Sequence, residues 1–506
     1  MFLLPLLVAC DPAEDSGNPL VYAFPEGFRW GAAGAAHQIE GGNTNNNWYQ
    51  FETLPEFAGK TAEPSGAGVD GYARYEEDAD LLVDLGADVY RLSIEWSRVE
   101  PARDTWNEEE WAHYGAVIDA LRARGVEPMI TLHHFTDPIW TYDLTDVECE
   151  SGPSDTNLCG WTNPEVPAEF AEFAAEAALR FGDRVDEWTT FNEPGGYLLS
   201  GYLGGAFPPG EMNLTTGSVE SRIFPVAAGM LDANAAAYAA VKANDLVDAD
   251  GDGVVARVGF TNSIQWIVPA DPDDPADVAA ADRVRGLYGY LFPDAMINGL
   301  LDRDLDGVPE ESHPEWAGTC DLLGYQYYFR MYVTSVPNFP PIEAVPCDRT
   351  MLSIFGLDPA VLGCPEVNED DVTQMGYEHY SPGLGLLAPE MASRYPGTPL
   401  RVTEAGIATT TGKRRGESIV RQLAGLSEAI EAGAPVDGYI HWSLTDNFEW
   451  ADGYRPRFGL YTVDRDTFAR TPNEGVDVLS RIIADNGIRR DLWEQYGEGE
   501  HLSPGE

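Results

Sequence analysis

Short runs of apolar and β-branched residues recur along the chain, and each is followed by a polar loop and a stretch with helical periodicity. The clearest helical stretch is 167–182, where Phe170, Phe173, Ala174 and Ala177 fall on one face of a helix. A strand followed by a helix, repeated along the chain, is typical of a parallel sheet. The eight runs that we interpret as strands are 28–36, 89–94, 127–134, 188–194, 256–264, 322–328, 400–406 and 438–444.

Eight such units predict an α/β fold, a single (β/α)8 TIM barrel whose chemistry lies at the C-terminal ends of its strands. A doubly wound open sheet is the structural alternative. It requires a glycine-rich phosphate-binding turn after the first strand, and the segment GAAGAAHQ (31–38) fits GxGxxG poorly. The interior contains no repeat and no low-complexity linker. We therefore assign residues 21–496 to one domain.

The two ends of the chain differ from this domain. The apolar start, MFLLPLLVAC, is too short to span a bilayer, which takes about 20 residues. Leu7-Val8-Ala9-Cys10 resembles a bacterial lipobox, whose cysteine is lipidated, although no Lys or Arg precedes it. We expect a lipoprotein signal-like segment (1–10), a flexible tether (11–20) and a polar tail (497–506). The protein would then be lipid-anchored outside the cytoplasm, in the periplasm or on the cell surface.

The cysteines agree with an exported protein. Cys149 and Cys159 bracket a short polar insertion, and a disulfide between them would close a small loop. Cys320, Cys347 and Cys364 leave one thiol over, and we pair Cys347 with Cys364. No Cys/His spacing is typical of zinc.

The composition excludes two classes of protein. Acidic residues outnumber basic ones 84 to 31, for a net charge of −53, so the chain lacks the basic face that nucleic acid needs. Hydrophobic residues make up 44 % of the chain, enough for a large core, which excludes wholesale disorder. An acidic surface of this kind is typical of solubility in salty or calcium-rich surroundings.

Carboxylates, amides and aromatic rings gather at the ends of the predicted strands, with no cluster of metal ligands. Hydrolysis of a glycosidic bond needs that set, because two carboxyl groups flank the bond, polar groups bind hydroxyls and aromatic faces stack on the sugar. In chain order these residues are His37, Gln38, Glu40, Arg91, His133, His134, Phe135, Asn192, Glu193, Gln326, Tyr327, Tyr328, Glu404, Trp442, Asn447, Glu449 and Trp450.

Five segments at these positions resemble glycoside hydrolase family 1, the β-glucosidase and β-galactosidase family. They are FRWGAAGAAHQIEG (28–41), YRLSIEWSRVEP (90–101), TTFNEP (189–194), VTEAG (402–406) and HWSLTDNFEWADGYRPRFGLYTVD (441–464). The resemblance spans residues 24 to about 495 and implies a retaining exo-β-glycosidase that needs no cofactor for catalysis. It implies a β-glucosidase with β-galactosidase and β-fucosidase side activity, acting on β-glucosides and short β-linked oligosaccharides.

The resemblance also implies roles. Glu193, after strand four, corresponds to the acid/base, and Glu404, on strand seven, to the nucleophile. Arg91 and Tyr328 correspond to the pair that holds the nucleophile ionised and oriented. Asn192 corresponds to the residue that holds the C2 hydroxyl, Gln326 to the strand-six residue that contacts substrate, and Trp442 to the indole beneath the sugar ring. The residues that correspond to those binding the glycone hydroxyls are Gln38, His134, Glu449 and Trp450.

Some positions depart from the family pattern. Ala405 stands where TENG has its asparagine, Gln326 replaces an asparagine, and Thr136-Asp137-Pro138 replaces Asp-Leu-Pro. These changes bear on substrate preference and rate more than on the reaction. Members that act on 6-phospho-sugars carry a small residue in place of Glu449 and a nearby lysine. A carboxylate here would repel phosphate, so we expect such sugars to be rejected.

Two acidic loops have the DxDxDG start of a calcium loop: Asp248, Asp250 and Asp252 in the first, and Asp302, Asp304 and Asp306 in the second. Neither has a glutamate at the twelfth position, where Gly259 and His313 stand. Structural calcium and a simple Asp-Gly turn both fit these segments.

Two other functions remain as alternatives. An endo-β-glycanase of the same barrel clan would share Asn192-Glu193, but the strand-eight block and Gln38 resemble residues that close a pocket around one terminal sugar. An inactive sugar-binding lipoprotein would not need both glutamates. Beyond its sugar substrates we predict no nucleic-acid partner, membrane contact only through the lipid anchor, and no particular oligomeric state.

Overall fold

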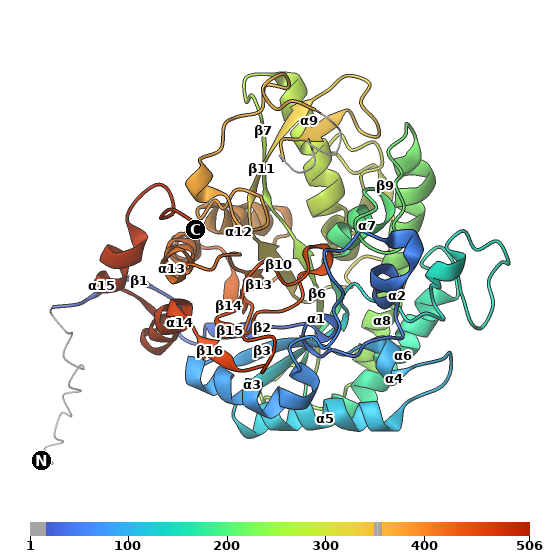
Figure 1. Cartoon of the computed structure of the whole chain (residues 1–506), viewed down its shortest axis with the longest axis horizontal. Coiled ribbons are helices and arrows are strands. Elements are labelled where there is room, and N and C mark those ends of the chain that lie inside the picture. The colour runs from blue at the N-terminus through green and yellow to red at the C-terminus, as the bar shows by residue number, and fades with distance from the viewer. Residues whose placement is uncertain (1–16, 349–351, 353–356, 506) are drawn as a thin grey trace, which may run out of the picture.

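Eight parallel strands form a closed barrel at the centre of the molecule (Figure 1), so the TIM-barrel prediction is confirmed and the open sheet is wrong. The computed structural model describes residues 17–348, 352 and 357–505. Around the barrel the order is β10-β13-β14-β2-β3-β4-β5-β6. In chain order the barrel strands are β2 (Arg29–Ala33), β3 (Val89–Ser93), β4 (Glu127–His133), β5 (Glu187–Asn192), β6 (Arg257–Ser263), β10 (Leu323–Tyr327), β13 (Leu400–Ala405) and β14 (Val436–Trp442).

Helices surround the barrel (Figure 1), and their apolar residues belong to the buried core. On α6, the four residues that gave the helical period, Phe170, Phe173, Ala174 and Ala177, are fully buried. Asn107 caps α5 by accepting from the backbone N–H groups of residues 109 and 110. The α-helices are α1 (Ala36–Ile39), α2 (Asn47–Thr53), α3 (Gly71–Leu85), α4 (Trp96–Val99), α5 (Glu108–Ala123), α6 (Val166–Phe181), α7 (Pro194–Tyr202), α8 (Phe224–Asn244), α9 (Pro275–Val284), α10 (Leu291–Pro293), α12 (Gly383–Arg394), α13 (Gly412–Glu431), α14 (Glu474–Asp485) and α15 (Arg490–Leu492).

A small sheet of β7 (Trp266–Pro269), β11 (Arg330–Ser335) and β12 (Ala344–Pro346) extends the barrel beyond the C-terminal ends of β6 and β10. Strands β7 and β11 are parallel to each other, as β6 and β10 are. Only two residues separate β6 from β7, and only two separate β10 from β11. Those two-residue steps, 264–265 and 328–329, therefore lie at the rim of the barrel.

The remaining short elements connect these layers. The 3-10 helices are η1 (Pro55–Phe57), η2 (Leu144–Asp146), η6 (Glu369–Asp371) and η7 (Trp450–Asp452), and the π-helical turns are η3 (Val219–Ile223), η4 (Arg285–Tyr290), η5 (Asp294–Asn298) and η8 (Trp493–Gly497). The paired strands outside the barrel are β1 (Leu20–Ala23) with β17 (Gly487–Arg489), β8 (Leu300–Leu301) with β9 (Glu311–Ser312), and β15 (Tyr461–Val463) with β16 (Arg470–Pro472).

The described part of the N-terminal region corrects one predicted boundary. Leu20, placed in the flexible tether, pairs with Arg489 in the β1–β17 ladder, and Asn18 donates to Asp491 at 2.8 Å. A tether that ends at residue 20 is therefore wrong, since the chain is already bound to the domain at Asn18. In the polar tail, Leu502 is buried and the backbone N–H of Ser503 donates to Glu417 at 2.7 Å. Cys10 lies outside the described residues, so its lipidation stays a prediction.

Both predicted cysteine pairs form disulfides, Cys149 with Cys159 and Cys347 with Cys364, and Cys320 is the free thiol among the cysteines that the structure describes. Burial raises the pKa of the Cys320 thiol to about 12, which disfavours the nucleophilic thiolate. Among the described residues, no helix combines the length and the apolar character needed to cross a membrane.

A buried ion-pair cluster lies at the opposite end of the barrel from the strand C-termini. Arg401 contacts Glu187 at 2.5 Å and Asp437 at 2.7 Å, and Arg257 contacts Glu187 at 3.1 Å. Burial alone would raise the pKa of Glu187, but Arg401 outweighs it and lowers that pKa to about 2. The cluster ties β5, β6, β13 and β14 together beneath the site.

Candidate active site

A cavity of about 140 Å³ opens at the C-terminal ends of the barrel strands and gathers most of the predicted site residues. They come from six of the eight strand ends, so only barrel closure brings them together. The predicted residues that line it are Gln38, His134, Asn192, Glu193, Tyr328, Glu404, Trp442, Glu449 and Trp450.

Glu404, on β13, is held on both oxygens. The guanidinium of Arg91, on β3, donates to its Oε1, and the hydroxyl of Tyr328 donates to its Oε2 at 2.5 Å. Burial raises the pKa of Glu404, and Arg91 and Tyr328 act in the opposite direction. These two contacts favour an ionised carboxylate whose orientation is fixed.

Glu193 follows β5 directly and lies in different surroundings. Its backbone has φ 42°, and its N–H donates to the carbonyl of Thr261 at 2.7 Å, which aims the side chain into the cavity before α7 begins at Pro194. Burial, and then the negative charge of Glu404, raise the pKa of Glu193 to about 8. Glu193 therefore keeps its proton at neutral pH, while Arg91 and Tyr328 oppose protonation of Glu404.

Arg91 and Gln326 lie beneath the cavity rather than on its wall. Both donate to Oδ1 of Asn192, at 2.6 and 2.8 Å, and the hydroxyl of Thr261 donates to the same oxygen at 3.0 Å. Three donors on one oxygen fix the amide of Asn192 so that it presents its NH₂ group to the cavity. Gln326 supports Asn192 through its Nε2 and does not line the cavity, and its expected contact with substrate stays a prediction.

Two unpaired acceptors belong to other residues that line the cavity. Gln38 donates through Nε2 to the carbonyl of Phe448 at 2.8 Å, and its Oε1, like Oε2 of Glu449, has no hydrogen-bond partner among the described residues. A buried acceptor without a donor is costly, so both oxygens are suited to bind hydroxyl groups of a ligand. Burial, followed by the charge of Glu404, raises the pKa of Glu449 well above its usual range.

Aromatic rings enclose the same space. The His134 ring stacks near those of Trp442 and Trp450, with centroids 6.1 and 6.0 Å apart and interplanar angles of 19° and 17°. Burial, and then Arg91, hold the pKa of His134 well below its usual range, so this imidazole is neutral. The cavity thus combines flat apolar faces with neutral and acidic hydrogen-bonding groups, as sugar rings require.

Several lining residues were missed from the sequence. Ser263, the last residue of β6, lies beside Glu193 and hydrogen-bonds the Tyr288 hydroxyl at 2.9 Å. The position of Ser263 at the end of a strand could have identified it from the sequence, but β6 was the one predicted strand from which we selected no candidate residue. Tyr288, Phe207, Met375 and Tyr377 lie outside the barrel strands, where no motif marks them.

Comparison with known proteins now decides the family. The sequence model of glycosyl hydrolase family 1 matches residues 21–488. The chain belongs to glycosyl hydrolase family 1. It is a β-glycosidase of that family, and family 1 enzymes act without a cofactor.

Family 1 relatives cover nearly the whole chain. A β-galactosidase from Pyrococcus woesei is 34 % identical over 94 % of this chain and 100 % of its own length, and β-glucosidase 12 from Oryza sativa subsp. japonica is 30 % identical over 92 % and 93 %. A β-glycosidase from Pyrococcus horikoshii is 31 % identical with a TM-score of 0.76, covering 95 % of this chain and 99 % of that one. A Thermotoga maritima β-glucosidase in complex with galacto-hydroximolactam is 25 % identical with a TM-score of 0.77, covering 92 % and 100 %.

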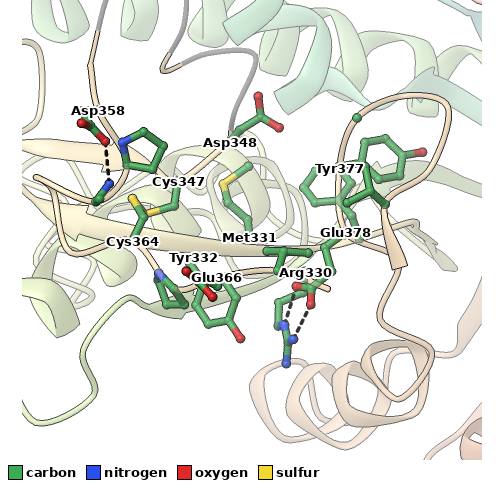
Figure 2. Close-up of a pocket in the computed structure, with 17 residues that line it drawn as sticks. Arg330, Met331, Tyr332, Cys347, Asp348, Asp358, Cys364, Glu366, Tyr377 and Glu378 are labelled. Carbon is green, nitrogen blue, oxygen red and sulfur yellow. Dashed lines mark hydrogen bonds and ion pairs between the residues drawn. A yellow bond between two sulfur atoms is a disulfide. The ribbon is translucent and has the colours of Figure 1, made fainter. Parts of the chain in front are cut away.

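A larger groove of about 520 Å³ borders the family 1 cavity (Figure 2). Phe329 and Tyr377 line both spaces, and their rings pack with centroids 4.7 Å apart. The disulfide between Cys347 and Cys364 lies on the groove wall, as Figure 2 shows.

The acidic loops have their own partners. Asp302, Asp304 and Asp306 come together as predicted, but Asp302 already accepts from the backbone N–H groups of Asp306 and Gly307 at 3.2 and 2.8 Å. In the first predicted loop, Asp248 and Asp250 group with Asp186, whereas Asp252 pairs with Arg257 at 3.0 Å and lies outside the group.

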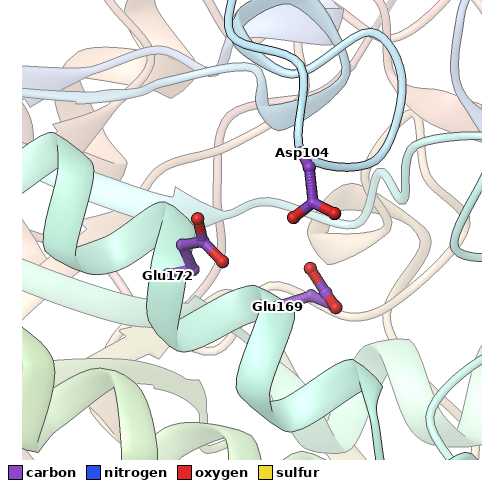
Figure 3. A group of neighbouring side chains, drawn as sticks. All are labelled: Asp104, Glu169 and Glu172. Atoms are coloured by element: carbon purple, nitrogen blue, oxygen red, sulfur yellow. The ribbon is translucent and has the colours of Figure 1, made fainter.

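A third acidic group, absent from the sequence predictions, consists of Asp104, Glu169 and Glu172 (Figure 3). Arg103 donates to Glu169 at 2.9 Å, which compensates part of its charge. None of the three groups lines the catalytic cavity, and calcium at the two predicted loops stays a prediction.

Proposed function

We propose that this family 1 chain is a retaining exo-β-glycosidase that hydrolyses terminal β-glucosides, with β-galactosidase and β-fucosidase side activity. One observation carries the proposal: two carboxyl groups share one cavity, and their surroundings favour opposite protonation states. Retaining glycosidases need that pairing, because one carboxyl must attack as an anion and the other must donate a proton.

In the first step Glu404 attacks the anomeric carbon, and the C1–O bond to the leaving group breaks as Glu193 protonates that oxygen. The product is a glycosyl ester of Glu404. In the second step Glu193, now a carboxylate, takes a proton from water, which attacks the same carbon and releases Glu404. Arg91 and Tyr328 keep Glu404 ionised in its free state and orient it for the attack.

The glycone preference is supported by the unpaired acceptors. Gln38 Oε1 and Glu449 Oε2 can accept from hydroxyls in either configuration at C4, which suits both glucosides and galactosides. Relatives of this chain are named β-galactosidase and β-glucosidase, and the Thermotoga enzyme occurs in complexes with both glucoimidazole and galacto-hydroximolactam. The small volume of the cavity favours one terminal sugar over an extended chain.

Family membership alone does not establish catalytic activity, since one relative that is 29 % identical is named a probable inactive β-glucosidase. The test is therefore made on the carboxyl groups. Wild type should release phenol from aryl β-glucosides. Glu404→Ala should be inactive and regain turnover with azide, giving an α-glycosyl azide by inversion, because azide fills the space of the missing nucleophile.

Glu193→Ala should retain cleavage of dinitrophenyl glucosides, which need no proton, and lose cleavage of cellobiose. Normal hydrolysis of cellobiose by either variant would refute the assignment. Internal cleavage of a long β-glucan by wild type, without release of monosaccharide, would favour the endo-glycanase alternative. Sugar binding without any turnover would favour the inactive lipoprotein.

We also propose that the enzyme acts outside the cytoplasm, anchored by a lipid on Cys10. The lipobox-like Leu7-Val8-Ala9-Cys10 motivates the proposal, and the two disulfides support an oxidising compartment. Full-length protein should partition with membranes, and Cys10→Ser should not. Cytosolic partition of both forms, with Met1 retained, would contradict it.

A further inference from the structure

Gln265 lies where the barrel passes into the small sheet, and the family resemblance assigns it no role. It occupies the two-residue step between β6 and β7, beside the matching step 328–329 between β10 and β11. Its side chain is 3 % exposed, and every polar atom of its amide is engaged. The contacts lead to both catalytic carboxyl groups.

The carbonyl oxygen of this amide holds the residue that orients the nucleophile. Oε1 accepts from the backbone N–H groups of Tyr328 and Phe329, at 2.9 and 3.0 Å. The hydroxyl of Tyr328 in turn donates to Glu404. Because Tyr328 belongs to no strand, these two bonds fix the backbone from which its ring reaches the nucleophile.

The nitrogen of the same amide acts on the acid/base side. Nε2 donates to Oγ of Ser263 at 2.8 Å, and the Tyr288 hydroxyl lies 2.9 Å from that oxygen. A hydroxyl has one proton and two acceptor lone pairs. The Gln265 amide occupies one of these lone pairs, and the Ser263 hydroxyl lines the cavity beside Glu193, whose pKa it lowers.

We propose that Gln265 is a positioning residue that sets Tyr328 on the nucleophile and Ser263 on the acid/base through one buried amide. The proposal rests on the proposed function. An amide supplies an acceptor oxygen and a donor nitrogen on one carbon, as the two contacts require. The two steps of the reaction are thereby coupled to a single side chain that touches neither carboxyl group.

The expected consequences follow from which groups face Glu193. The groups around Glu193 include Glu404 on β13, Arg91 on β3, Ser263 on β6 and Tyr288, whose own pKa Glu193 raises. Of these groups, Ser263 and Arg91 lower the pKa of Glu193. Displacement of the Ser263 hydroxyl from Glu193 should therefore raise that pKa. Loss of the Tyr328 anchor should weaken the ionised form of Glu404, whose pKa then rises as well.

The experiment compares Gln265→Met, which removes both contacts, with Ser263→Ala, which removes the acid/base contact alone. Rates per active site, titrated with a 2-deoxy-2-fluoro-glucoside, are measured against pH on dinitrophenyl β-glucoside and cellobiose. Gln265→Met should raise both limbs of the kcat/KM profile by about 0.5 to 1 pH unit and slow both substrates by about tenfold or more. Ser263→Ala should raise the alkaline limb alone and slow cellobiose more than the activated glucoside.

The control is Gln422→Met, the same change at a fully buried glutamine on α13, which should leave both limbs in place. If Gln265→Met does not fold, Gln265→Asn, which withdraws the amide by one methylene, carries the same test. The proposal would be overturned by a Gln265 variant that yields less folded protein but whose active sites keep the wild-type limbs of the kcat/KM profile and the wild-type ratio of rates on the two substrates. Absence of wild-type turnover on every aryl β-glycoside would instead overturn the proposed function.

Discussion

Removing one hydroxyl, by Tyr328→Phe, isolates what the nucleophile gains from its surroundings. The hydroxyl donates to Oε2 of Glu404 at 2.5 Å, while Arg91 holds Oε1 and stays in place. A hydrogen bond to a charged group contributes about 1.5–3 kcal/mol, which corresponds to about 1–2 pH units. Because the lost bond favours the ionised form, the pKa of Glu404 must rise, and the acid limb of kcat/KM should move up by that amount.

The assay is the pH dependence of kcat/KM on dinitrophenyl β-glucoside, whose leaving group needs no proton. The alkaline limb on cellobiose, which reports Glu193 and is expected near pH 8, should shift less than the acid limb. Tyr327→Phe is the matched control, because the hydroxyl of that neighbouring, fully buried tyrosine donates to the carbonyl of Tyr380 at 2.5 Å, away from the cavity. An acid limb unchanged in Tyr328→Phe, or shifted equally in the control, would refute the reasoning.

Three further outcomes are expected. Glu187→Gln should lower the free energy of unfolding by about 3 kcal/mol at neutral pH, because the pKa of Glu187 is about 2 in place of the ordinary 4.5. Wild type should lose this contribution as the pH falls from about 4.5 to about 2, and equal stability of the two proteins in urea unfolding at neutral pH would contradict the prediction. Chelation of divalent cations should leave turnover of aryl glucosides unchanged. A fall in kcat that added calcium reverses would contradict this prediction. A 6-phospho-β-glucoside should be hydrolysed far more slowly than its parent because the described residues that line the cavity offer Glu449 and neither Lys nor Arg to bind phosphate, and a preference for the phosphorylated sugar would exclude this account.

The fold was predictable because its signal is repeated. Each barrel strand is buried on both faces, so it reads as a short apolar run, and all eight runs coincide with barrel strands. The small sheet β7–β11–β12 was not predicted, since β7 and β11 follow β6 and β10 after only two residues and merge with them in the sequence pattern. The tether boundary was wrong at Leu20 because a short edge strand in a polar segment has no periodicity of its own.

The two carboxyl groups of the site were predictable for a related reason. In a barrel, strand C-termini share one rim, so Glu193 and Glu404 could be assigned to one site without knowledge of any side-chain contact. The strand of Gln326 was predicted, but its contact with Asn192 was not. Its amide nitrogen donates to Asn192, and that contact depends on a side-chain torsion that strand position does not determine.

The supports of the site could not be predicted, because their roles depend on partners distant in the sequence. Gln265 sits in a two-residue step with no motif, and its importance emerges only when β6 and β10 lie side by side and bring the N–H groups of Tyr328 and Phe329 to its oxygen. A site that must keep one carboxyl protonated and its neighbour ionised needs such supports on both. Sequence motifs therefore identify the reacting groups, while the burial, charges and hydrogen bonds around them come from the strand pairings of the barrel.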